Sequence, residues 1–237
     1  MSKLSIIIPA FNEGKTIHLI LDKIKAVRLL DNMEKEIIIV DDGSNDDTHE
    51  RVLSYHKANC DLTIRYFLNQ KNCGKGFSLN RGLNEATGDY LIVQDADTEY
   101  DPEEYNKLLK PMLHNGADVV YGSRFMGGSA HRILFFWHSI GNKFLTFLSN
   151  AGTNLNLTDM ETGYKLFRKE IFQQITLKEK RFGFEPEVTA KLAKIKNIRI
   201  YEVGISYYGR TYEEGKKINW KDGIRAIYCI LRYNYFS

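Results

Sequence analysis

The sequence predicts an α/β fold in which a mostly parallel central sheet is flanked by helices. Short apolar runs, which are typical of buried strands, occur at residues 4–9, 36–40, 62–67, 90–93 and 117–121. The intervening segments carry apolar residues at helical spacing, at 13–28, 47–56, 74–86 and from 101 onward. Strands that alternate with helices in this way form parallel sheets covered on both faces.

Each of these elements has its own start or stop signal. Pro9 closes the first strand, and Asp46 or Asp47 can cap the helix that follows the second. The segment Gly74-Lys75-Gly76 opens the next helix. Pro102 stands near the first turn of the helix after the fourth strand, where proline is well tolerated. Strands and helices are therefore predicted to alternate along the chain from residue 4 to residue 121.

After Gly122 the alternation stops. We expect helices over 132–150, 185–194 and 220–233, short strands over 198–203 and 205–208, and a polar loop over 209–217. No segment has the composition of a linker, so residues 1–237 are interpreted as one domain. Its nucleotide-binding half would be 1–125 and its acceptor half 126–237, with amphipathic helices near 131–150 and 219–235.

Charge is distributed unevenly along the chain. Residues 1–120 carry 14 Lys and Arg against 20 Asp and Glu, a net charge of −6, whereas residues 121–237 carry 19 against 10, a net charge of +9. The total of +3 is too small to indicate nucleic-acid binding. An acidic first half suits a divalent cation, and a basic second half suits phosphates or an anionic membrane surface.

Cysteine usage and hydropathy bear on location. The three cysteines are odd in number and widely spaced, which favours a reducing, cytoplasmic setting. The N-terminus leads directly into a predicted strand, without the pattern of a signal peptide. No apolar run reaches the roughly 18–20 residues of a membrane-spanning helix. The aromatic, basic second half nevertheless favours peripheral contact with the cytoplasmic face of a membrane, or with a membrane-protein partner.

Three polar clusters follow strands of the predicted sheet, at residues 9–13, 41–44 and 95–97. Because parallel α/β sheets bind ligands beyond the carboxyl ends of their strands, we expect these clusters to meet at one edge. Asp95 and Asp97 flank a single residue, so the two carboxylates can share Mg²⁺ or Mn²⁺, and Glu99 could add a third ligand.

The ordered motifs resemble those of family 2 glycosyltransferases. They are Ile7-Ile8-Pro9-Ala10-Phe11-Asn12-Glu13, Val40-Asp41-Asp42-Gly43-Ser44, Gly74-Lys75-Gly76, Asp95-Ala96-Asp97 and Gly122-Ser123-Arg124. This resemblance implies a GT-A type fold and an inverting, metal-dependent transfer from a nucleotide-sugar, with UDP- and GDP-sugars both open. Thr158-Asp159-Met160-Glu161-Thr162-Gly163-Tyr164-Lys165 is similar to a segment of the subgroup that makes polyprenyl- or dolichyl-phosphate sugars.

The resemblance also implies residue roles. Pro9, Phe11, Glu13 and Asp41 or Asp42 would bind the nucleoside, Lys75 and Ala96 would line its pocket, and Asp95 would bind the sugar or ribose. Asp97, Glu99 and Asp95 would bind the metal. Catalysis would rest on Asp95, Asp97, Asp159 and Arg124, and the acceptor phosphate would meet Arg124, Arg132, Arg210 and Lys216.

Other functions stay open at this point. Transfer to a hydroxyl of a glycan acceptor, in cell-surface polysaccharide synthesis, would need a carboxylate base, for which Asp159 or Glu161 is the candidate. A nucleotidyltransferase also uses a metal and a nucleotide-binding sheet, but its Gly-rich, basic loop after the first strand is missing. A non-catalytic nucleotide-sugar-binding module is the last alternative.

Overall fold

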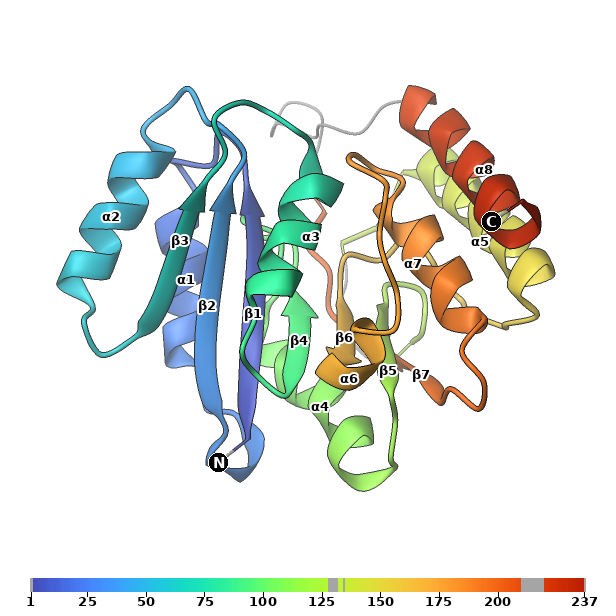
Figure 1. The fold of residues 1–237 in the computed structure, drawn as a ribbon, viewed down its shortest axis with the longest axis horizontal. Coiled ribbons are helices and arrows are strands. Elements are labelled where there is room, and N and C mark those ends of the chain that lie inside the picture. The colour runs from blue at the N-terminus through green and yellow to red at the C-terminus, as the bar shows by residue number, and fades with distance from the viewer. Residues whose placement is uncertain (1, 128–131, 134, 210–219, 237) are drawn as a thin grey trace.

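The protein is described by a computed structural model that covers residues 2–127, 132–133, 135–209 and 220–236 (Figure 1). The strands are β1 (Lys3–Ala10), β2 (Glu34–Asp41), β3 (Thr63–Leu68), β4 (Tyr90–Val93), β5 (Val119–Ser123), β6 (Lys165–Arg168) and β7 (Ile200–Gly204). The α-helices are α1 (Ile17–Ala26), α2 (Thr48–Ala58), α3 (Lys75–Glu85), α4 (Tyr105–His114), α5 (Phe136–Thr153), α6 (Lys169–Phe172), α7 (Phe184–Ala193) and α8 (Trp220–Tyr235). Short 3₁₀ turns lie at Leu30–Asn32 and Pro102–Glu104.

The strands form one seven-stranded sheet in the order β3-β2-β1-β4-β6-β5-β7. Neighbouring strands are parallel except at β6, which is antiparallel to both β4 and β5. The predicted α/β class with a mostly parallel sheet is therefore confirmed. β1 and β4 are neighbouring parallel strands, so their carboxyl ends lie beside each other at the same edge of the sheet.

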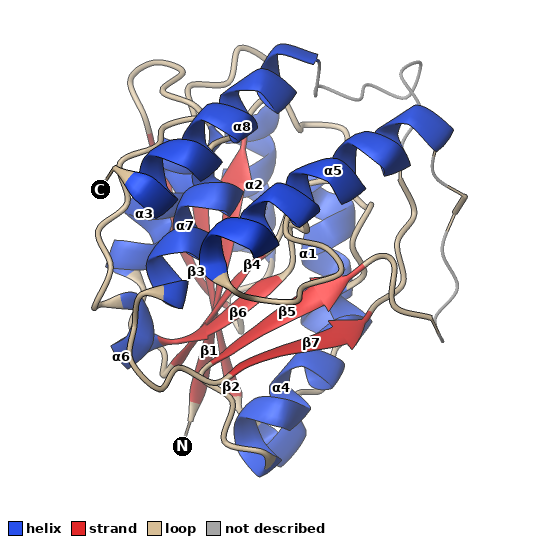
Figure 2. Ribbon diagram, turned by 90° about the vertical axis from the view of Figure 1, so that its right-hand side faces the viewer, coloured by secondary structure: helices blue, strands red, loops and turns tan. Residues whose placement is uncertain are grey.

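Alternate residues of the central strands enter two different cores. Ile6, Ile8 and Ile37 pack with α1, α2 and α4 on one face, whereas Ile7 and Ile38 pack with α3 and α7 on the other. Both faces of the sheet are buried, which explains why the sequences of β1 and β2 are continuous apolar runs and do not alternate between apolar and polar residues. Figure 2 shows the helices on either side of the sheet.

α5 and α8 form an additional layer. Both contact α7 and each other, and both views place them side by side on the outer side of α7, away from the sheet (Figures 1 and 2). They occupy the ranges where amphipathic helices were predicted. Within the described residues, no helix has both the length and the apolar character needed to cross a bilayer.

Three details differ from the sequence prediction. The prediction omitted β6, a four-residue strand whose first side chain is a fully buried lysine, Lys165. The predicted strand over 205–208 is irregular except for a single bridge at Tyr207. The first helix begins at Ile17 rather than at Glu13, because residues 11–14 form a loop held by the turn after β2.

Candidate functional site

The loop after β1 is tied to the turn after β2 by hydrogen bonds. Asn12 donates from its backbone N to Ser44 Oγ at 2.9 Å, and its Oδ1 accepts from Asn45 N at 2.8 Å. Glu13 N donates to Thr48 Oγ1 at 2.9 Å. Asn12 has a φ of 54°, a left-handed conformation that asparagine tolerates better than most residues. Two of the three predicted polar clusters therefore form one rigid unit, which includes Phe11.

Asp41 and Asp42 are both buried, and each holds a piece of backbone or a side chain. Asp41 accepts from Ser44 N and from Tyr66 Oη, each at 2.8 Å. Asp42 accepts from Gly74 N at 2.7 Å, and also from Cys73 N and Asn69 Nδ2. Both carboxylates thus shape the edge of the sheet, and Asp42 fixes the start of α3. Their contact with a nucleoside stays a prediction.

The start of α3 also touches the chain segment before α7. Gly74 has a φ of 101°, and a Cβ at this position would lie 2.3 Å from Lys180 O, so only glycine fits there. Phe77 N donates to Lys180 O at 3.0 Å. The adjacent Glu179 accepts from Arg225 and Tyr233 of α8, at distances down to 2.7 Å. One short segment therefore connects α3 with α8.

Lys75 lies between two carboxylates. Its Nζ is 2.7 Å from Asp95 Oδ1 and 3.8 Å from Glu185 Oε1. Burial alone would lower the pKa of Lys75, but the charges of Asp95 and Glu185 outweigh it and raise that pKa above its usual value. The ammonium is thus a permanent positive charge at the carboxyl end of β4. Glu185, in the first turn of α7, was not predicted from the sequence.

Asp97 and Glu99 continue the acidic segment after β4. Asp97 is buried and its Oδ1 accepts from Glu99 N at 3.1 Å, whereas Glu99 Oε2 accepts from Tyr207 Oη at 2.8 Å. Among the residues that the structure describes, no cluster of three His, Cys, Asp or Glu side chains is arranged to hold a metal ion. Mg²⁺ is commonly bound by only one or two carboxylates together with substrate phosphates. The carboxylates present here therefore fit a cation whose remaining ligands come from the phosphates of a bound nucleotide.

Arg124 and Asp159 form a two-pronged ion pair at the end of β5. Arg124 Nε donates to Asp159 Oδ2 at 2.7 Å and Nη2 donates to Oδ1 at 2.8 Å. The Arg124 backbone N and Asn142 Nδ2 also donate to this carboxylate. Burial would raise the pKa of Asp159, but the charge and hydrogen bonds of Arg124 outweigh it and lower that pKa. Asp159 is therefore a buried anion that orients Arg124.

Tyrosine rings line the space between the two ion pairs. Tyr100 packs against Tyr164 and Tyr207, with ring centroids 4.7 and 5.0 Å apart, and the Arg124 guanidinium lies 5.3 Å from the Tyr207 ring centroid. Tyr100 Oη accepts from Gly163 N at 2.9 Å. A Cβ at Gly163 would lie 2.9 Å from Asp95 Oδ2, so the segment before β6 packs directly on Asp95. The Asp95 and Arg124 clusters thus belong to one site.

Glu161 and Lys165 lie on this same segment. Glu161 Oε1 is buried and has no hydrogen-bond partner among the described residues, while Lys165 Nζ donates to the carbonyls of Met160 and Thr162. Burial and the nearby charge of Glu185 raise the pKa of Glu161 to about 8, and burial lowers the pKa of Lys165 to about 8. Both shifts favour the uncharged forms of these two buried groups.

The remaining predicted residues are placed as follows. Pro9 lies near the end of β1, and Ala96 is buried between Asp95 and Asp97. Arg132 is exposed and lies along the segment after β7, because its N donates to Tyr207 O and its Nη1 to Gly209 O. Arg210 and Lys216 lie outside the described residues. Arg132 therefore borders the segment that continues into Arg210.

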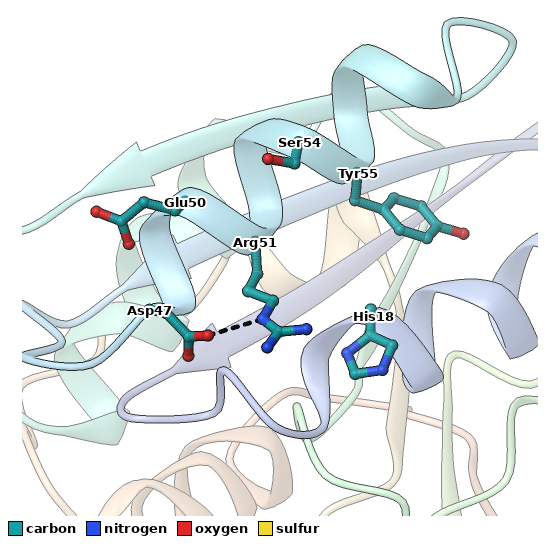
Figure 3. A pocket seen from close by; sticks show the side chains of 6 residues that line it. All are labelled: His18, Asp47, Glu50, Arg51, Ser54 and Tyr55. Carbon is teal, nitrogen blue, oxygen red and sulfur yellow. Dashed lines mark hydrogen bonds and ion pairs between the residues drawn. The ribbon is translucent and has the colours of Figure 1, made fainter.

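A separate hollow of about 430 Å³ lies between α1 and α2 (Figure 3). It is lined by His18, Asp47, Glu50, Arg51, Ser54 and Tyr55. Asp47 and Arg51 pair across one turn of α2 at 2.8 Å. None of the predicted site residues lines this hollow, so we do not assign the site there.

Comparison with known proteins assigns the chain to a family. Residues 5–176 match the glycosyl transferase family 2. Dolichol-phosphate mannosyltransferase of Pyrococcus furiosus is 26% identical over 234 residues, which are 98% of this chain and 64% of that protein. Dolichyl-phosphate beta-glucosyltransferase of Dictyostelium discoideum is 30% identical over 232 residues, 91% of this chain and 68% of that protein. The chain thus spans about two thirds of the length of these relatives, and slightly less for the first.

Among solved structures, glucosyl-3-phosphoglycerate synthase from Mycobacterium tuberculosis is similar over the whole chain. The TM-score is 0.75 at 19% identity, covering 100% of this chain and 80% of the synthase, which was solved with Mn²⁺, UDP and phosphoglyceric acid. A further crystal structure of the synthase holds Mg²⁺ and UDP. At this identity the likeness concerns the fold, and it confirms the predicted GT-A type.

Proposed function

Because the chain belongs to glycosyl transferase family 2, we propose that it moves a sugar from a nucleotide-sugar to a polyprenyl phosphate, with inversion and with a bound Mg²⁺ or Mn²⁺. The proposal includes action at the cytoplasmic face of a membrane, since a polyprenyl chain partitions into lipid. The names of the dolichyl-phosphate relatives support this choice of acceptor.

The Arg124–Asp159 pair is the observation that carries the proposal. Transfer to a hydroxyl group needs a base to accept the proton. Asp159 is a poor base because both of its oxygens accept hydrogen bonds from Arg124 and its pKa is lowered. Burial raises the pKa of Glu161, the other candidate, which reduces the fraction of its carboxylate that is ready to accept a proton. An acceptor that is already anionic, such as a phosphate, needs neither of them.

A phosphate acceptor instead requires cations that offset its repulsion from the donor diphosphate. Arg124 is held rigidly by Asp159, and a planar guanidinium suits phosphate oxygens. Lys75 supplies a second positive charge on the Asp95 side of the site. We assign Arg124 to the acceptor phosphate together with Arg132, Arg210 and Lys216, which the sequence predicted for this role.

On the donor side, Asp97, Glu99 and Asp95 would hold the cation, which when bound offsets the negative charge of the leaving diphosphate. Pro9, Phe11, Glu13, Asp41 or Asp42, Lys75 and Ala96 would form the nucleoside side of the pocket. The rigid loop pair after β1 and β2 supports this assignment, because a preorganised pocket orients its ligand at little entropic cost.

The test is an acceptor comparison with the purified full chain and Mn²⁺. Release of nucleoside diphosphate from several UDP- and GDP-sugars would be measured with short-chain polyprenyl phosphate, with 3-phosphoglycerate and with no acceptor. We expect release that requires the polyprenyl phosphate and is lost in the Asp97→Ala variant.

Two outcomes would contradict the proposal. Release that requires 3-phosphoglycerate and ignores the polyprenyl phosphate would indicate a hydroxyl acceptor, for which Glu161 becomes the candidate base. Release that is unchanged in the Asp97→Ala variant would contradict the assignment of Asp97 as a metal ligand. Lys107→Ala, an exposed residue of α4, serves as the matched control and should retain full activity.

A further inference from the structure

α5 presents most of its large apolar side chains outward, although Leu145 and Leu148 pack against the core. The buried residues of this helix are Thr146 and Ser149. Thr146 Oγ1 accepts from Met160 N at 3.2 Å, and Asn142 and Asn150 bind Asp159 and the backbone of Leu157. A helix that faces water normally has the reverse arrangement, with its apolar stripe turned toward the core. The outer face of α5 is therefore unsuited to water.

The outward residues of α5 form a single stripe. They recur at spacings of three and four along the helix, and are Trp137, Ile140, Phe144 and Phe147, with Phe136 beside them. Trp137 is 79% exposed and Phe147 is 66% exposed. Ile133 and Phe135, just before the helix, are exposed as well.

α8 carries a second stripe of the same kind. Ile224, Tyr228, Leu231 and Tyr235 recur at spacings of four, three and four, and all are exposed, as is Phe236. The opposite face of α8 is buried against α7 through Ala226, Ile230 and Tyr233. α5 and α8 lie side by side on the outer side of α7 (Figure 2), and each carries one exposed stripe. We call the two stripes together the outer face.

Charges around the outer face are mostly positive. The two helices contain Lys143, Lys221, Arg225 and Arg232 against a single acid, Asp222, and Arg225 is paired with Glu179. On the helical projection, Lys143 flanks the stripe of α5, and the basic residues of α8 flank its own stripe on one side. Aromatic rings with flanking Lys and Arg are the composition of helices that lie in a membrane interface.

We propose that the outer face docks on an anionic lipid surface, with the rings of α5 and α8 among the acyl chains and the flanking cations among the headgroups. Charge complementarity selects this occupant over a second copy of the chain, because two such faces would bring like charges together. This inference rests on the membrane location in the proposed function and deepens it by naming the surface that meets the lipid. Docking itself requires neither donor nor acceptor, so it is tested without transfer.

The test is flotation of the purified full chain, without nucleotide, on vesicles. One set consists of phosphatidylcholine and the other of an equimolar mixture with phosphatidylglycerol. We expect binding to the anionic vesicles that weakens with added salt. Trp137→Ser with Phe147→Ser should lower the partition coefficient by about tenfold or more, because two exposed rings no longer enter lipid.

A charge variant and a control complete the design. Lys143→Glu with Arg232→Glu should abolish the preference for anionic vesicles. Leu53→Ser with Lys57→Glu makes equivalent changes on α2, at the other end of the molecule, and should leave partitioning unchanged within about twofold (Figure 1). Circular dichroism verifies that each variant is folded, and all substituted side chains except Arg232 are largely exposed.

Three results would overturn the proposal. The wild-type chain could fail to float with anionic vesicles at low salt, or the aromatic variant could float as well as the wild type. Light scattering in vesicle-free buffer could also show a dimer that the aromatic variant abolishes, which would assign the outer face to a second copy. Because no transfer is measured, none of these results bears on the acceptor comparison.

Discussion

Lys75 Nζ lies 2.7 Å from Asp95 Oδ1, so the first acid of the Asp95-Ala96-Asp97 segment is paired with a cation from the start of α3. Asp42 holds that start of α3 through the backbone of Cys73 and Gly74. The polar cluster at residues 41–44 thus positions Lys75, the cation that pairs with the cluster at residues 95–97.

Lys75→Ala should weaken the binding of a nucleoside diphosphate in the presence of Mn²⁺ by about tenfold or more, since the variant lacks the ammonium that would donate a charge-assisted hydrogen bond to phosphate. The affinity for Mn²⁺ alone should not fall, because Asp95 and Glu185 lose their positive neighbour. Isothermal titration calorimetry with UDP and GDP measures both. Lys23→Ala, which breaks the exposed pair with Asp101, is the matched control. Equal diphosphate affinities for Lys75→Ala and wild type would refute this role.

Asp159→Asn should reduce transfer by about a hundredfold or more and lower the free energy of unfolding by about 3–5 kcal/mol, because Arg124 becomes a buried cation without its anion. Asp118→Asn is a close control. Asp118 accepts from Arg199 in the same two-pronged geometry, but Arg199 is 56% exposed. The control should retain activity and lose about 1 kcal/mol or less. Activity assays and urea unfolding separate the two effects, and similar losses in both variants would contradict a role for Arg124 in the site.

The sequence predicted the parts of this site better than their connections. Apolar runs revealed β1 to β5, and the residues after them marked the sheet edge correctly. β6 was missed because Lys165-Leu166-Phe167-Arg168 begins and ends with basic residues and is short. Asp159 and Arg124 were each predicted, but they are 35 residues apart, and no local pattern shows that they pair.

Other contacts had no signal at all. Glu185 reads as an ordinary acid in the first turn of a helix, and Tyr100 and Tyr207 read as core residues in separate segments. Antiparallel β6 lies between β4 and β5, and the residues before it, Gly163 and Tyr164, contact Tyr100. A topology with one reversed strand cannot be read from hydrophobic periodicity, since periodicity reports burial and not direction.

Glu161→Gln should stabilise the protein most at alkaline pH. The pKa of Glu161 is raised from 4.5 to about 8 in the folded state, so folding favours its protonated form. The penalty for ionising it therefore grows as pH rises from about 4.5 to about 8 and is complete above that. Glutamine cannot ionise, so the variant should gain about 2 kcal/mol or more above pH 8 and little near pH 5. Urea unfolding across this range measures the difference, and a gain that does not vary with pH would contradict it.

Glu179→Ala should release α8 from the segment before α7. Its carboxylate accepts from Arg225 and from the buried Tyr233, so the substitution removes the hydrogen bonds to both helix residues and should cost about 1–3 kcal/mol of unfolding free energy. Thermal unfolding measures the loss. Arg225→Ala removes only the more exposed partner and should cost less, so a larger loss for Arg225→Ala would contradict this account.

The segment at Glu179 and Lys180 has a thermodynamic consequence. It contacts α8 of the outer face through Glu179 and the start of α3 through Lys180, so any binding event that displaced this segment at one end would also act on its contacts at the other. Such a linkage is reciprocal: any factor by which a bound surface changes donor affinity must equal the factor by which bound donor changes affinity for that surface. A single loop of this kind would let the protein register, at its nucleotide end, whether its other end is occupied.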